Sequence, residues 1–157
     1  MPFVSVTRLR PRRLWLAPLL VADSLRIARQ VRGAAGFLGG YLAIGQGLSF
    51  WTVSVWEGAA AMVAFRNSGA HRKAMPRLIR ICDEASYAHW DQPVLTPPCP
   101  AEAALRLASA GRLSKVRHPS ADQIAGRTWP DGVAPTPRRR LEPLSQAAAV
   151  VGSTAKR

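Results

Sequence analysis

Residues 48–56 constrain the fold of this chain more strongly than any other segment. Their sequence, LSFWTVSVW, alternates with the period of two that is typical of a β-strand. Large apolar side chains nevertheless occur on both faces, because Phe50 and Trp56 share one face while Trp51 and Val53 share the other. A strand from a sheet with one face in water would have one polar face instead. We therefore expect this strand to be covered twice, by helices on one side and by a partner sheet or a ligand on the other.

The surrounding segments predict an α+β domain. Gly45 and Gly47 suit a hairpin turn before residue 48, and Pro76 should either kink a helix or begin a new one. Strands are predicted at 2–8, 37–44, 48–56 and 86–90, and helices at 14–32, 57–67 and 70–85. The resulting order, β-α-β-β-α-β, defines a ferredoxin-like antiparallel sheet.

The composition changes after this domain, which we assign to residues 1–91. Residues 92–157 form an extension rich in proline and arginine, with one possible helix at 101–110. The extension has few large apolar side chains, so it cannot bury enough surface to order itself independently. We expect it either to drape over the domain or to be partly disordered, and Arg138 to Arg140 are the best candidates for disorder.

The formal net charge of +13 is spread along the chain. A diffuse positive field favours polyanions in general, whether nucleic acid, anionic lipid or an anionic substrate. No nucleic-acid-binding motif accompanies the charge, so no specific nucleic-acid partner is predicted. Cys82 and Cys99 lack a CxxC or metal-site spacing, which argues against a zinc site or a disulfide framework. A reducing compartment, the cytoplasm, fits best.

One segment imitates a secretion signal. Four arginines, at positions 8, 10, 12 and 13, precede the apolar run 14–22. Pro18 interrupts that run, and residues 24–32 continue it as an amphipathic helix, so we interpret it as part of the domain. No run approaches the twenty apolar residues that a membrane span requires.

The strand at 48–56 and the segments after it resemble the dimeric α+β barrel superfamily of antibiotic-biosynthesis monooxygenases, and most closely its spheroidene-monooxygenase-like branch. In that branch a tryptophan-bearing strand leads into a helix, and a phenylalanine, a small turn and Gly-Ala-His-Arg follow. The residues that carry the resemblance are Phe50, Trp51, Trp56, Met62, Phe65, Gly69, Ala70, His71 and Arg72. The likeness covers residues 2–90 and does not extend to the last third of the chain.

The resemblance implies a homodimer paired through its sheets, with a pocket in each subunit between the sheet and the helices. Some relatives bind haem and activate oxygen on iron, whereas others oxidise electron-rich aromatic compounds without a cofactor. The glycine-tryptophan-phenylalanine stretch expected of the carotenoid enzymes after the second helix is replaced here by residues 82–86. This difference argues against a carotenoid substrate.

His71 is the main candidate site residue, because a neutral imidazole beneath a pocket of tryptophans suits a proximal haem ligand. The resemblance adds Arg72, Phe65 and Trp56 as cofactor-binding candidates, with Asn67 and Trp51 as further catalytic candidates. Each has a simpler structural interpretation. His71 would pack the turn, Asn67 and Ser68 would cap a helix, and Arg72 would be solvated. Trp51 and Trp56 point to opposite faces, so at most one of them lines a given cavity. Other polar residues are given structural roles. His89 is interpreted as a residue on a sheet face, and His118, in the extension, is a still weaker site candidate. Asp83 and Glu84 are expected at a helix end on the surface.

Three functions follow from these observations. The first is a haem-dependent monooxygenase, an oxidoreductase that acts on a hydrophobic small molecule in a biosynthetic pathway through His71. The second is a monooxygenase of the same fold without a cofactor, in which Asn67 or His71 assists proton removal. The third is a non-catalytic module that binds a small molecule or a protein partner.

Overall fold

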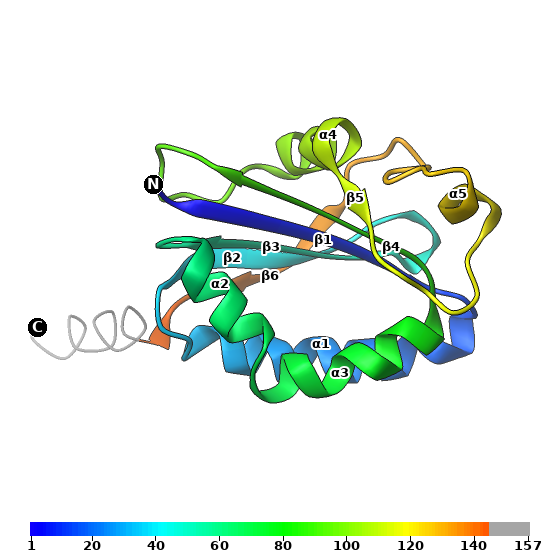
Figure 1. Cartoon of the computed structure of the whole chain (residues 1–157), viewed down its shortest axis with the longest axis horizontal. Coiled ribbons are helices and arrows are strands. Elements are labelled where there is room, and N and C mark those ends of the chain that lie inside the picture. Colours follow the sequence, from blue (N-terminus) through cyan, green and yellow to red (C-terminus); the bar gives the residue numbers. More distant parts are fainter. Residues whose placement is uncertain (145–157) are drawn as a thin grey trace, which may run out of the picture.

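A single antiparallel sheet lies between two layers of helices in the computed structural model, which describes residues 1–144 (Figure 1). Within these residues the sheet has six strands in the order β5-β4-β1-β3-β2-β6. The strands are β1 (Phe3–Pro11), β2 (Phe37–Ile44), β3 (Phe50–Trp56), β4 (Cys82–Asp91), β5 (Arg112–Leu113) and β6 (Thr136–Leu141). The helices are α1 (Ala17–Arg32), preceded by the 3-10 turn η1 (Leu14–Leu16), α2 (Ala59–Arg66), α3 (Gly69–Ile81), α4 (Pro100–Ala110) and α5 (Ala121–Ile124), with a second 3-10 turn, η2 (Gln46–Leu48).

The predicted ferredoxin-like order is confirmed by the four central strands, β4-β1-β3-β2. Several boundaries differ from the prediction, for example β1 continues to Pro11 and β3 begins at Phe50, and the largest difference lies where the last helix meets the last predicted strand. The helix predicted at 70–85 ends at Ile81 as α3, and β4 begins at Cys82 rather than at residue 86. The reason is that β1 continues to Pro11, so its last residues offer backbone partners to the chain from Cys82 onward. Pro76 lies inside α3, which continues through it.

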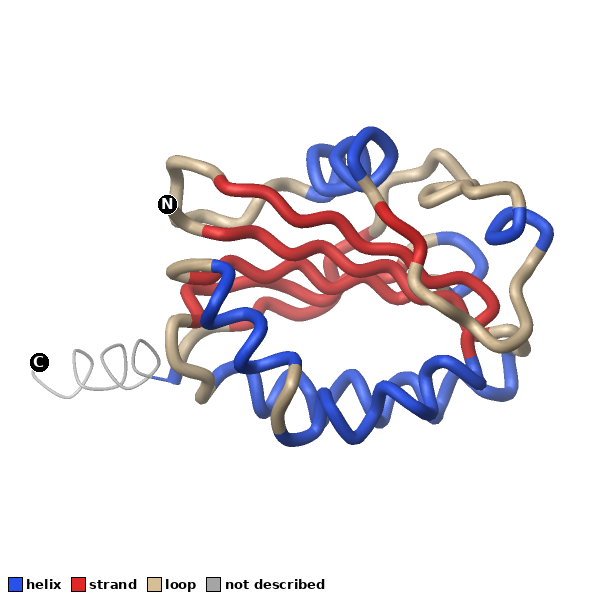
Figure 2. The backbone as a smooth tube through the Cα atoms, in the orientation of Figure 1, coloured by secondary structure: helices blue, strands red, loops and turns tan. Residues whose placement is uncertain are grey.

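Helices α1, α2 and α3 cover one face of the sheet, called the pocket face below, as Figure 2 shows. The apolar segment that imitates a secretion signal is part of this layer, because Leu16 and Leu20 are buried against α3. A buried carboxylate, Asp23 of α1, accepts two hydrogen bonds from Arg77 and so ties α1 to α3. No helix of the described residues is both long enough and apolar enough to cross a membrane.

Helix α4 covers the opposite face of the sheet, called the far face below (Figure 1). Trp51, Val53 and Val55 of β3 pack there in one apolar cluster with Leu107 of α4. The strand is therefore covered on both sides, as predicted. The prediction that a partner sheet provides the second cover is wrong for this face, because the chain's own extension occupies it. A homodimer through another surface stays a prediction.

The extension is ordered as far as Leu144, and its remaining residues lie outside the described part of the chain. The predicted helix at 101–110 is confirmed as α4. The prediction that Arg138 to Arg140 are disordered is wrong, because they lie in β6 and pair with β2. Their side chains are exposed, and the strand is held by backbone hydrogen bonds to the free edge of β2. Such bonds require no apolar side chains, so composition could not reveal this strand.

A buried ionic network joins the extension to β1 and β4. Arg8 donates to Glu84 at 2.7 Å and to Asp131 of the extension at 3.2 Å. Arg10 contacts Glu84 at 3.1 Å, and the Ser120 hydroxyl donates to the same carboxylate at 2.9 Å. Glu84 was predicted to lie at a helix end on the surface. That prediction is wrong, because Glu84 belongs to a central strand and is almost fully buried.

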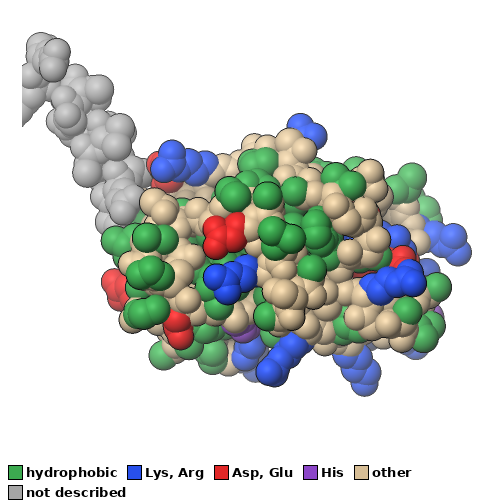
Figure 3. Space-filling view, turned by 90° about the horizontal axis from the view of Figure 1, so that it is seen from above, with side chains coloured by type: hydrophobic (Ala, Val, Ile, Leu, Met, Phe, Trp, Pro, Cys, Tyr) green, Lys and Arg blue, Asp and Glu red, His purple; other side chains and the backbone are tan. Residues whose placement is uncertain are grey.

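Asp83, its neighbour, also belongs to β4 and accepts two hydrogen bonds from Arg10. The outer surface on the side of α4 shows groups of apolar side chains separated by charged and other polar ones (Figure 3). Leu105 of α4 is among the exposed apolar side chains.

Candidate active site

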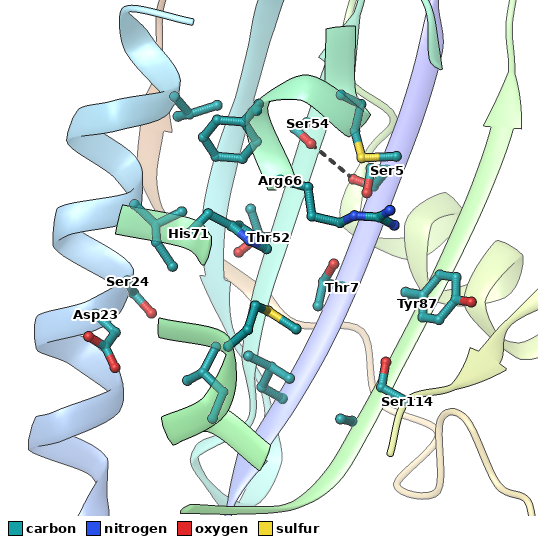
Figure 4. A pocket seen from close by; sticks show the side chains of 18 of the residues that line it. Ser5, Thr7, Asp23, Ser24, Thr52, Ser54, Arg66, His71, Tyr87 and Ser114 are labelled. Carbon is teal, nitrogen blue, oxygen red and sulfur yellow. Dashed lines mark hydrogen bonds between the residues drawn. The ribbon is translucent and has the colours of Figure 1, made fainter. Parts of the chain in front are cut away.

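A cavity of about 250 Å³ lies between the pocket face of the sheet and helices α1 to α3 (Figure 4). Most of its lining is apolar, including Leu20 and Ile27 of α1 and Met62 of α2. The strands contribute Thr7 and Thr52 to the lining, and their small side chains leave open space beside the sheet. The polar and aromatic groups that line the cavity are Ser5, Thr7, Thr52, Ser54, Trp56, Phe65, Arg66, His71, Tyr87, His89, Ser114 and Lys115, together with Asp23 and Ser24 of α1.

A row of aromatic rings leads to the cavity, and Trp56, Phe65 and His71 of this row line it as an aromatic wall. Phe37 contacts Trp56 with ring centroids 5.3 Å apart, and Trp56 contacts Phe65 at 5.0 Å. Phe65 in turn meets the imidazole of His71 edge-on at 5.3 Å. The indole nitrogen of Trp56 donates to the Ser54 hydroxyl at 3.0 Å, so this ring is held in a fixed orientation. The wall therefore suits a flat apolar ligand.

The turn between α2 and α3 places His71 at the cavity. Gly69 has φ +52°, a left-handed conformation that favours glycine, and a Cβ at this position would lie 2.9 Å from the side chain of Gln30 and would displace it. Gln30 of α1 accepts from the backbone N–H of His71 at 2.8 Å and donates to the carbonyl of Ser68 at 2.9 Å. Gln30 thus supplies hydrogen-bond partners to backbone groups at the start of α3, a capping role that the sequence suggested for Ser68. The Ser68 hydroxyl instead donates to the carbonyl of Phe65 at 3.0 Å.

The imidazole of His71 is suited to act as a base. Its Nδ1 atom is buried and makes no hydrogen bond among the described residues. Burial lowers the pKa of His71 below its usual value more than a contact with the Arg66 backbone raises it, and the Arg66 charge lowers this pKa further. His71 is therefore neutral at pH 7 and can accept a proton. A buried nitrogen without a partner also points to a ligand that would supply one.

Arg66 gives the cavity a positive character. Its side chain points toward the cavity in Figure 4 and contributes to the lining, although the residue is exposed to solvent, and it makes no ion pair within residues 1–144. Burial lowers the pKa of His89, on the β4 side of the cavity, and the charges of Arg66 and Arg112 lower it further. The acidic group of the lining, Asp23, is already paired with arginines. The site therefore favours a ligand that carries or develops negative charge.

The structure brings together some of the predicted site residues and separates others. His71, Phe65 and Trp56 line the cavity, as the resemblance implied. Asn67, at the end of α2, and Arg72, on the outer side of α3, are exposed and do not line it.

Trp51 cannot take part in this site. It lies on the far face, where it is buried in the cluster beneath α4, and its indole donates to Ser49 at 3.2 Å. The period of two that places Trp56 in the cavity necessarily turns Trp51 away from it.

Several lining residues were missed or given another role. Arg66 follows Phe65 at the end of α2, and the sequence offers no local sign that its side chain turns inward. Tyr87 and His89 alternate along β4, so the same period of two could have assigned them to one face. Ser114 and Lys115 belong to the extension, and only tertiary packing brings them to the cavity.

The residues around His71 do not form a haem site. A proximal histidine normally donates its second N–H to a carbonyl or carboxylate, but Nδ1 of His71 is buried and has no such partner among the residues that the structure describes. The positive charge of Arg66, which lowers the pKa of His71, would also disfavour an iron cation at this imidazole. Among the described residues, no cluster of three or more His, Cys, Asp or Glu side chains could hold a metal ion.

These features define an α+β protein with a ferredoxin-like antiparallel sheet and a cavity beneath its helices. Comparison with solved structures confirms this fold. Rv0793 from Mycobacterium tuberculosis superposes with a TM-score of 0.55 at 14% identity, over 59% of this chain and 95% of that chain. An alanine variant of SnoaB, a cofactor-independent oxygenase from Streptomyces nogalater, gives 0.51 at 13% identity, over 59% of this chain and 94% of that chain.

A structure described as an antibiotic biosynthesis monooxygenase gives a TM-score of 0.53 at 11% identity, over 57% of this chain and 97% of that chain. At these identities the likeness concerns the fold alone. Each of the three structures is covered nearly from end to end, whereas this chain continues well beyond the shared part. No protein-family profile matches the chain, and no curated protein matches it.

Proposed function

We propose that this protein is a monooxygenase that works without haem and oxidises an apolar small molecule with an acidic C–H group. The observation that carries the proposal is the neutral imidazole of His71, whose buried Nδ1 has no hydrogen-bond partner within residues 1–144 and whose pKa the Arg66 charge lowers. The apolar aromatic wall would hold a flat substrate, and His71 would act on it as the base.

The chemistry begins with the transfer of a proton from an activated CH₂ group to His71. Arg66 stabilises the negative charge that develops on the substrate, because its guanidinium reaches the cavity and carries no carboxylate partner within residues 1–144. The carbanion transfers electron density to oxygen, and a C–O bond forms to give a peroxide anion, which takes the proton back from His71. The hydroperoxide then eliminates water and leaves a carbonyl. The sum is one CH₂ group and one O₂ converted to one C=O group and one water, so no external reductant is needed.

The comparisons support this proposal through the fold. SnoaB is described as a cofactor-independent oxygenase, and another structure of this fold is described as an antibiotic biosynthesis monooxygenase. A biosynthetic substrate with fused aromatic rings, such as an anthrone, has the required acidic CH₂ group and the flat shape of the aromatic wall.

Replacing His71 by glutamine is expected to lower kcat with an anthrone-like substrate about 100-fold, because a general base contributes 10²- to 10⁴-fold. The measurement is oxygen consumption in the presence of a chelator. His118→Gln is the matched control, because His118 is exposed in the extension and outside the cavity. Equal rates for His71→Gln and the unaltered protein would refute the role of His71 as a base. Binding of the anthrone without oxygen uptake by the unaltered protein would instead identify a small-molecule carrier.

The rate should also fall at low pH, because protonation of His71 removes the base. His71 must be neutral to accept a proton, and its pKa lies below the ordinary value of 6.5. We expect kcat/KM to be constant above pH 6.5 and to fall tenfold per pH unit below the pKa of His71. A profile of kcat/KM from pH 4 to 8 tests this, with circular dichroism at each pH as a control for folding. A rate that rises as the pH falls would be incompatible with a neutral imidazole base.

A further inference from the structure

Helix α1 exposes apolar side chains on the side that faces away from the sheet. Trp15, Pro18, Leu25 and Arg29 follow one another at helical spacing on this outer side, opposite the buried Leu20. Trp15 is 71% exposed and Leu14 is 68% exposed, although both are large apolar residues. We call this surface the α1 outer patch, which consists of Leu14, Trp15, Leu19 and Leu25 with Arg12, Arg13, Arg26 and Arg29 around them.

The patch is basic as well as apolar. Its arginines precede and follow the apolar residues in the chain, and all four are exposed. Helix α1 has a single acidic residue, Asp23, which is buried and bound to Arg77. Among the described residues, Arg12, Arg13 and Arg29 form no ion pair. The positive charge of the patch is therefore not neutralised within this part of the molecule.

We propose that the α1 outer patch binds the surface of an anionic lipid bilayer. A helix that presents tryptophan and leucine between arginines matches a membrane interface, where the ring and the aliphatic side chains enter the acyl boundary. The guanidinium groups then reach the lipid phosphates, with their aliphatic stems along the apolar layer. The proposal concerns peripheral binding and is independent of the proposed oxidation.

Charge complementarity favours lipid over a second copy of the chain. In a two-fold symmetric contact the same patch would face itself, so arginines would meet arginines without an exposed carboxylate from α1 between them. Nucleic acid would also attract the arginines. However, Leu14, Leu19 and Leu25 would gain nothing from phosphates and sugars, whereas a bilayer would bury them.

The other side of α1 lines the cavity through Leu20 and Ile27. Binding at the outer patch would therefore place the lipid on one side of α1 and the cavity on the other side of the same helix. An apolar small molecule dissolved in the membrane would then be close to the site.

The test is co-sedimentation of the full chain with vesicles of phosphatidylcholine alone and with vesicles that also contain phosphatidylglycerol. We expect binding only to the anionic vesicles, and weaker binding as salt is raised. Trp15→Glu should weaken binding at least about tenfold. The double variant Arg12→Gln, Arg13→Gln should weaken it about 30-fold, because each basic side chain near an anionic surface contributes about fivefold. The matched control is Leu105→Glu, an exposed apolar position on α4, which should bind as the unaltered protein does.

Trp15→Phe provides a second readout. It keeps an apolar ring, so binding should persist, but the blue shift of tryptophan fluorescence on vesicle addition should largely disappear. Equal binding to both vesicle types, no binding, or binding that Trp15→Glu leaves unchanged would overturn the proposal. Dimer formation or oligonucleotide binding that depends on Trp15, without vesicle binding, would overturn it in favour of a second copy or of nucleic acid.

Discussion

Replacing Leu107 by aspartate is expected to lower the free energy of unfolding by about 4 kcal/mol or more. Leu107 belongs to α4 and is 0% exposed, in contact with the apolar cluster on the far face of the sheet. Truncation of a buried leucine alone costs about 2–5 kcal/mol, and a carboxylate without a partner in this cluster adds a desolvation penalty. Urea unfolding at pH 7, followed by circular dichroism, measures the loss.

Leu105→Asp is the control for this prediction, because it introduces the same side chain on the same helix. Leu105 is 63% exposed, so the change should stay within about 0.5 kcal/mol of the unaltered protein. Equal losses for the two variants would show that α4 does not pack on the sheet through Leu107. In that case the far face would need another cover, such as the partner sheet expected from the sequence.

Removing the carboxylate of Glu84 is expected to cost about 3–5 kcal/mol. Glu84→Ala would leave the guanidinium of Arg8, which is 2% exposed, without its closest partner at 2.7 Å. A buried charge that loses its closest partner is strongly destabilising, and the guanidinium of Arg8 would keep only the longer contact with Asp131 at 3.2 Å. The loss would also release Ser120, which donates to Glu84 from the extension. Chemical denaturation at pH 7 measures the change.

Two further variants make this prediction specific. Glu142→Ala removes a carboxylate from a half-exposed ion pair with Arg140 and should change stability by less than about 1 kcal/mol. Replacing Arg8 by methionine and Glu84 by leucine together should recover part of the loss, because no unpaired charge is then buried at these two positions. A double variant that is less stable than Glu84→Ala would contradict this explanation.

Local periodicity accounts for the parts of the fold that were predicted. The alternation in residues 50–56 placed Trp56 and Trp51 on opposite faces before the sheet was known. The spacing of apolar residues predicted α1, and the glycine after Asn67 and Ser68 predicted the turn that leads to His71. These features depend on side chains a few residues apart, so they are visible in a short stretch of sequence.

The functional site was only partly predictable. Phe65, Trp56 and His71 were expected in it because the family resemblance included them. The inward orientation of Arg66 depends on how α2 lies over the sheet, and the extension reaches the cavity with Ser114 and Lys115. None of these three side chains has a sequence pattern that marks it as part of a pocket.

The sequence by itself determined that the central strand must be buried on both faces, that the first domain follows the ferredoxin-like order and that His71 follows a glycine turn. Only the tertiary structure decided that α4 covers the far face, that β6 adds to the sheet edge and that Glu84 pairs with Arg8 across 76 positions. The physical reason is distance along the chain. Backbone pairing at a sheet edge and ion pairing between remote residues leave no local periodicity, because their partners are brought together only by folding.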